Sequence, residues 1–130
     1  MELSGWRVRW ERNEVPFNGL SNLDGVLDDL QERFKGEDGQ MVEVVSPEGD
    51  SLAIGLGKSK SVLSYVSRTG DPPYYVSVGT GREDETISFL FSGEFSEFSG
   101  RNTISLEAAR AAVRAFVQTG ELSPLMSWEE

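Results

Sequence analysis

The sequence predicts an α+β fold, an antiparallel meander sheet of about five or six strands with two amphipathic helices packed on one face. Short apolar segments separated by tight turns fill the middle of the chain, which is typical of an antiparallel meander. Two longer segments instead repeat their apolar residues at helical spacing. With 130 residues, the chain has the size of one domain, which we place at residues 1–130.

The first predicted strand and the first predicted helix lie before residue 36. Trp6, Val8 and Trp10 alternate with charged residues, which indicates a half-buried strand. After a loop, Ser21 or Asn22 can cap a helix with one apolar face. That face consists of Leu23, Val26, Leu27, Leu30 and Phe34.

Short strands are expected between the two helices. They are predicted at residues 41–45, 52–56, 62–66, 74–78 and 87–91. The segment 52–56 has one thin face, because Ala53 and Gly55 alternate with larger residues. Residues 79–85 and 93–100 are predicted as acidic loops. Tight turns between short strands favour an antiparallel order.

The second helix has clear signals at both ends. Ser105 is a good N-cap, Glu107 suits the first turn, and Gly120 ends the helix. Its apolar stripe consists of Leu106, Ala109, Val113, Phe116 and Val117. Beyond it, the ring of Trp128 needs cover, so we expect the tail to fold back onto the domain.

Composition excludes several classes of function. The chain contains neither cysteine nor histidine, which removes disulfides, thiolate chemistry, and the commonest general base and metal ligand. Carboxylate, lysine and tyrosine chemistry remain available. We therefore expect a non-enzymatic protein that holds no metal and no cofactor.

Charge points towards a basic partner. The chain has 12 basic and 22 acidic residues, a net charge of −10. Such a chain is repelled by nucleic acid and by anionic membrane, so we expect it to contact neither directly. It is attracted to basic surfaces, although acidity can also serve solubility alone. The N-terminus has no apolar region typical of a signal peptide, so we expect a cytoplasmic protein. We also expect it to be a monomer when free of its partner.

Two short motifs invite a chemical interpretation. Gly55 to Ser59 resembles the end of a phosphate-binding loop, but Leu52 stands where that loop needs its first glycine, which favours a hairpin turn. Glu83, Asp84 and Glu85 could bind a hard cation. The alternating oxygen ligands of such sites are missing, so a solvated acidic loop is the preferred interpretation.

Aromatic residues lie close to acidic ones in two places. Glu94 and Glu97 could form a carboxylate pair for acid–base chemistry. Their position around Phe95 instead favours a contact site for a basic protein, although that phenylalanine could also close the core. Tyr74 and Tyr75 are further candidates, and strand alternation should direct one inward and the other outward.

The order of these segments resembles a known family. The chain combines a Gly-Glu-Phe segment, an Ile-Ser-Leu-Glu-Ala-Ala-Arg helix start at residues 104–110, Phe-Val-Gln-Thr-Gly at 116–120, and Pro-x-x-x-Trp-Glu at 124–129. This pattern is similar to the first catalogued immunity-protein family of bacterial polymorphic toxin systems. The similarity is strongest over residues 89–129, and it rests on order and spacing.

The resemblance implies a role and a partner. Members of this family are encoded beside a toxin whose C-terminal domain is often a nucleic-acid deaminase, and they have no catalytic residues. The resemblance thus implies binding to a basic, nucleic-acid-acting toxin, and we expect this binding to block the toxin's substrate groove. The family transfers no contact residues, so the candidate contacts come from the residue types discussed above: Glu83, Asp84, Glu85, Glu94, Phe95, Glu97, Tyr74 and Tyr75. A nuclease toxin, a carboxylate-dependent enzyme and a general protein-interaction domain stay open as alternatives.

Overall fold

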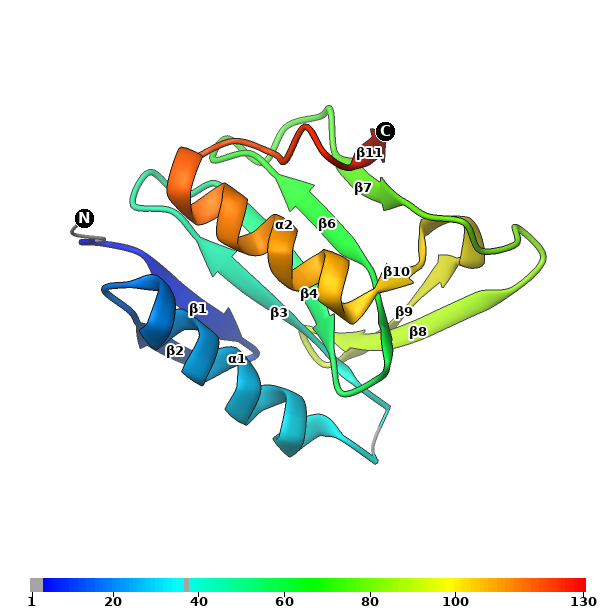
Figure 1. The fold of residues 1–130 in the computed structure, drawn as a ribbon, viewed down its shortest axis with the longest axis horizontal. Helices are drawn as coiled ribbons and strands as arrows, with labels where there is room; N and C mark the ends of the chain where they lie inside the picture. Colours follow the sequence, from blue (N-terminus) through cyan, green and yellow to red (C-terminus); the bar gives the residue numbers. More distant parts are fainter. Residues whose placement is uncertain (1–3, 37) are drawn as a thin grey trace.

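One mostly antiparallel sheet carries both long helices on the same side (Figure 1). The computed structural model describes residues 4–36 and 38–130. The strands are β1 (Arg7–Trp10), β2 (Asn13–Pro16), β3 (Gln40–Val45), β4 (Ser51–Leu56), β5 (Lys60–Ser61), β6 (Leu63–Val66), β7 (Tyr75–Val78), β8 (Thr86–Phe91), β9 (Glu94–Ser99), β10 (Ile104–Ser105) and β11 (Ser127–Glu129). The helices are α1 (Leu20–Phe34), the 3-10 turn η1 (Gly100–Asn102) and α2 (Leu106–Thr119).

The predicted α+β class is confirmed, and the sheet is larger than predicted. In the described residues it has nine strands, with the order β11-β7-β6-β4-β3-β1-β2, and β8 and β9 branch from β3. Strands β3, β4, β6 and β7 form the antiparallel meander. The prediction of five or six strands missed β2, β9 and β11, because these edge strands lack a long apolar alternation.

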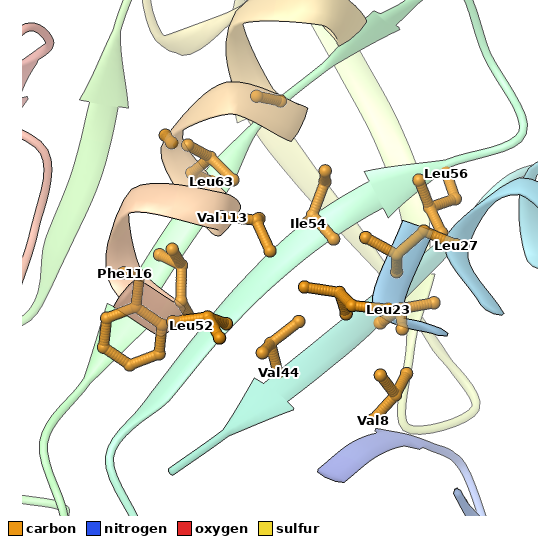
Figure 2. Packing of buried hydrophobic residues seen from close by; sticks show 14 of the residues in the cluster. Val8, Leu23, Leu27, Val44, Leu52, Ile54, Leu56, Leu63, Val113 and Phe116 are labelled. Carbon is orange, nitrogen blue, oxygen red and sulfur yellow. The ribbon is translucent and has the colours of Figure 1, made fainter. Parts of the chain in front are cut away.

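The main core fills the space between the helices and the sheet. Figure 2 shows side chains from both helices, such as Leu23 of α1 and Phe116 of α2, directed at the strands. From the sheet, Val44, Leu52 and Ile54 have no exposed surface. This burial of apolar surface is the main force that holds the two helices on the sheet.

A second, smaller core lies on the opposite face of the sheet. Phe89 of β8 is fully buried there with Met41, Ala53 and Val62. A Cβ atom at Gly55 would lie 2.5 Å from Cζ of Phe89, so the thin face of β4 is the space that the ring occupies. This contact, together with the β3–β8 pairing, seats the segment 86–99 on the sheet.

The predicted ends of α2 are confirmed, whereas the predicted start of α1 is not. The Ser105 hydroxyl accepts a hydrogen bond from the N–H of Ala108, and Gly120 adopts the left-handed conformation, as predicted for α2. The predicted cap of α1 at Ser21 or Asn22 is wrong, since the helix begins at Leu20 after Gly19. Leu20 packs against the main core, which favours the earlier start.

Ion pairs join the two helices across their outer surfaces. The Asp24 carboxylate of α1 accepts hydrogen bonds from Arg114, at 3.0 Å from Nε, and from Arg110, at 3.3 Å. Arg110 also binds Asp28 at 3.0 Å. The hydrogen bond from Arg114, with that from Arg110 beside it, lowers the pKa of Asp24 below its ordinary 3.8.

Asp24→Asn should therefore reduce stability in a pH-dependent way. Because the folded-state pKa is lowered, the carboxylate stabilises the fold above pH 3.8, and this contribution disappears as the pH falls through the lowered value. Urea unfolding at a series of pH values should show the variant less stable than the wild type at neutral pH. The difference should close in acid, and a difference that stays constant down to pH 2 contradicts the role of this carboxylate.

Candidate interaction surface

The segment 86–99 is a two-stranded hairpin, which we call the β8–β9 hairpin. Its turn consists of Ser92 and Gly93, with φ of 52° and 83°. Positive φ at both central residues matches the twist of a two-residue hairpin turn, and glycine adopts it without strain. The prediction of a loop at residues 93–100 is therefore wrong, since Glu94–Ser99 forms β9.

The polar composition of β9 follows from its position. It pairs with β8 alone in the described part of the chain. An exposed edge strand is commonly charged, which made Glu94 to Ser99 look like a loop in the sequence. Only Phe98 of this strand packs against the second core.

The two faces of the hairpin differ in what they contact. Phe89 and Phe98 belong to the inner face, which packs on the sheet. The outer face carries the alternate residues, with Leu90 opposite Phe95 and Ser88 opposite Glu97. Phe95 is 65% exposed, an unusual state for a large aromatic side chain. The outer face thus presents an apolar pair to solvent.

The acidic residues beside Phe95 have no basic partner in the part of the chain that the structure describes. None of the ion pairs formed within residues 4–36 and 38–130 involves Glu94 or Glu97. Both side chains are exposed. Since Glu94 and Glu97 are three positions apart on one strand, they belong to opposite faces and do not converge as acid–base pairs do.

The turn at residues 83–85 lies at the open end of the hairpin and is partly neutralised. Asp84 accepts hydrogen bonds from Arg82 at 2.8 and 3.0 Å, and Glu83 pairs with Arg101 at 3.3 Å. Only Glu85 of this group makes no ion pair with the described residues, and its carbonyl accepts a 2.7 Å hydrogen bond from Gly100. The three acids that the sequence groups together therefore differ in their availability to a partner.

Arg101 has a role that the sequence did not indicate. Its Nε atom lies 2.9 Å from Glu129, whose carboxylate also accepts a 2.8 Å hydrogen bond from Nδ2 of Asn102. The hydrogen bond from Asn102, and then that from Arg101, lowers the pKa of Glu129 below 4.5. These contacts fix the C-terminal strand β11 beside β7 and confirm that the tail folds back.

Tyr74 and Tyr75 lie apart from the hairpin. The ring of Tyr75 is 6.4 Å from that of Tyr65, which packs against Phe116 on the helix side of the sheet. Tyr74 is 48% exposed, and its hydroxyl donates a 2.7 Å hydrogen bond to the carbonyl of Gly70. One tyrosine is thus half-buried and the other exposed, but neither joins the outer face of the hairpin.

A hollow of about 600 Å³ adjoins the base of the hairpin, between the 83–85 turn and the start of α2. Lys60, Glu85 and Ser105 contribute polar groups to its wall. The Thr103 hydroxyl is buried here without a hydrogen-bond partner in the described chain. The base of the hairpin therefore adjoins a polar hollow.

The helices and acidic side chains of the described residues form neither a membrane span nor a cluster of metal ligands. Neither α1 nor α2 has the length and apolar character needed to cross a bilayer. Among residues 4–36 and 38–130, no three acidic side chains gather as metal ligands do. The most distinctive exposed feature is instead the outer face of the hairpin, an arrangement suited to binding another protein.

Comparison with known proteins identifies the family. The family model described as "Immunity protein Imm1" matches residues 11–130, nearly the whole chain. No curated protein matches the chain. The match confirms the resemblance drawn from the last third of the sequence and extends it over the meander and α1. The chain therefore belongs to the Imm1 immunity protein family, and its partner is a toxin.

Proposed function

We propose that this immunity protein neutralises a DNA deaminase toxin by covering the toxin's substrate groove with the outer face of the β8–β9 hairpin. One observation carries the proposal: Phe95 is 65% exposed, with Glu97 on the same face and Glu94 next to it in the chain, and neither acid has an ion-pair partner in the described chain. Binding alone achieves inhibition, in the cytoplasm and with one monomer per toxin. Tyr74 and Tyr75 remain outside the proposed surface.

An exposed aromatic side chain flanked by acids suits a basic partner. Burying the Phe95 ring supplies apolar contact area, and hot spots of protein interfaces are centred on such anchors. Glu97, on the same face as Phe95, then meets the cations of the partner, and the exposed Glu94 beside the turn adds to the local negative charge. Unpaired acids lose no internal ion pair when they bind.

A groove that binds nucleic acid is basic, because it must neutralise phosphates. A protein of net charge −10 is attracted to such a groove, and its carboxylates can take the places of phosphates. The deaminase assignment follows from the partners common in the family that the sequence resembles. A nuclease toxin has the same basic groove and is the alternative.

A titration tests the function. The toxin domain encoded by the gene next to this one should convert bases in a DNA substrate, and this activity should fall in proportion to added immunity protein and vanish at one equivalent. Cleavage of the DNA in place of base conversion would establish the nuclease alternative. Unchanged activity at several equivalents would refute the proposed function.

Removing the two acids beside Phe95 should slow association. At low salt we expect Glu94→Gln with Glu97→Gln to lower the association rate constant about tenfold, since electrostatic steering depends on charges near the contact. A stopped-flow measurement over a range of salt concentrations would show this, and the difference from the wild type should shrink as salt rises.

The matched control removes two exposed acids elsewhere. Glu48→Gln with Glu121→Gln gives the same net charge but leaves the hairpin unchanged. Its association rate constant should stay within about twofold of the wild type, because the effect of a charge falls off within a Debye length. Equal slowing by both pairs would mean that net charge, and not this surface, steers the toxin.

A further inference from the structure

We propose that the open edge of β9 takes up a strand of the toxin, with the main-chain groups of Phe95 and Glu97 forming the new hydrogen bonds. The inference rests on the proposed function in one respect, that the toxin meets this hairpin. It adds how the toxin is held: by strand addition to the sheet, and not by side-chain contacts alone.

The hairpin register determines which main-chain groups are free. The two-residue turn makes Phe91 and Glu94 a hydrogen-bonded pair, so every second residue of β9 from Glu94 onward points its N–H and C=O at β8. Gly100 lies in this series, and its N–H donates to the carbonyl of Glu85 at 2.7 Å.

The main-chain N–H and C=O groups of the alternate residues, Phe95 and Glu97, point away from β8. On β8, the N–H of Leu90 leaves the hairpin and donates to the carbonyl of Gly39 at 3.1 Å. Leu90 and its cross-strand neighbour Phe95 therefore form a non-hydrogen-bonded pair of the hairpin, and Ser88 and Glu97 form another. The N–H and C=O groups of Phe95 and Glu97 therefore lie along the open edge of β9, where no described strand pairs with them.

The described sheet has two other end strands, β2 and β11, and both are shorter than β9. Edge strand β2 has four residues and ends in Pro16, which lies opposite Arg7 and has no N–H to offer. Strand β9 has six residues and no proline. It is thus the longest open edge of the described sheet, and its charges determine what can pair there.

Charge selects a basic toxin strand over a second copy of this chain. Two copies paired along β9 would bring Glu94 and Glu97 of both chains together, each chain with a net charge of −10. Like charges facing each other across strands are destabilising. A toxin strand with lysine or arginine opposite Glu97 and an apolar residue against Phe95 satisfies both side chains and the main chain.

A proline substitution separates the main-chain contribution from the side chain. Glu97→Pro removes the outward N–H as well as the acid, and Glu97→Gln removes the charge alone. Losing the hydrogen bond leaves a toxin carbonyl unpaired, so Glu97→Pro should weaken binding about 10- to 100-fold more than Glu97→Gln. Equal dissociation constants for the two variants would overturn strand addition.

Strand β2 offers the matched control. Glu14 is an exposed acid on an edge strand, also at an outward position of its hairpin. Glu14→Pro should leave the dissociation constant for the toxin domain within about twofold of the wild type, because the lost N–H and the lost ion pair with Arg7 both belong to β2, which is outside the proposed surface. Thermal unfolding of both proline variants shows whether each is folded.

Amide hydrogen exchange on the wild-type protein tests strand addition without any variant. In the free protein the amides of Phe95 and Glu97 should exchange quickly, while those of Ser96 and Phe98 are protected by β8. Adding the neighbouring gene's toxin domain should protect Phe95 and Glu97.

If a complex forms and the amides of Phe95 and Glu97 still exchange quickly, strand addition is wrong but the inhibitor role stands. If no complex forms, the proposed function fails as well. Protection that grows with protein concentration alone would indicate self-pairing and would also overturn the proposal.

Discussion

Phe89→Ala is expected to lower the free energy of unfolding by about 3–5 kcal/mol, the range for removing a buried phenylalanine side chain. The ring is fully buried in the second core and fills the space above Gly55. Its loss leaves a cavity and weakens the seat of the hairpin, so neutralisation of the toxin should decline as well. Urea unfolding gives the stability, and the toxin titration gives the activity.

Gly55→Ala tests the same contact from the opposite side. The added methyl group would lie 2.5 to 2.7 Å from the Phe89 ring, and the ring or β4 must shift. We expect the single variant to be less stable by about 1–3 kcal/mol, which is typical of overpacking. In the Phe89→Ala background the methyl group enters vacated space and should be neutral or stabilising. Additive effects of the two substitutions would contradict direct packing.

Phe95→Ala should have the largest effect on toxin binding. We expect the binding free energy to weaken by about 2–4 kcal/mol, as for an aromatic hot spot. The side chain is 65% exposed in the free protein, so its own stability should change by less than about 0.5 kcal/mol. Calorimetric titration of the toxin domain gives the first quantity and urea unfolding the second.

Leu125→Ala is the matched control for that variant. Leu125 is 95% exposed and lies in the loop before β11, away from the hairpin. Its truncation removes a comparable apolar group from the surface. Both the binding free energy and the stability should stay within about 0.5 kcal/mol of the wild type. If Leu125→Ala weakened binding as much as Phe95→Ala does, exposed apolar side chains would contribute to toxin binding wherever they lie on the surface.

Local signals in the sequence predicted much of the fold. The apolar stripe of α2, its Ser105 cap and its Gly120 stop are all within one segment, and periodicity marked the central strands. Strand β9 was missed because an open edge selects glutamate and serine, which also favour loops. The fit of Phe89 over Gly55 joins residues 34 positions apart, and no local pattern encodes it.

The sequence predicted which kinds of residue form the candidate surface, but not how the fold arranges them. An aromatic residue between acids marked Phe95, and the structure places it on an exposed face. Sequence proximity could not show that Glu83 and Asp84 face arginines while Glu97 does not. Nor could it show the link from Arg101 to Glu129, since 28 positions separate the two residues.

Hydroxyl-radical footprinting tests the central claim most directly, because the three exposed large apolar side chains of the described chain are Tyr74, Phe95 and Leu125. Each is accessible to oxidation in the free protein, and each reports on a different part of the surface. With the toxin domain bound, Phe95 should be protected, while Tyr74 and Leu125 should oxidise as before. Protection of Tyr74 or Leu125 with Phe95 still freely oxidised would contradict the account.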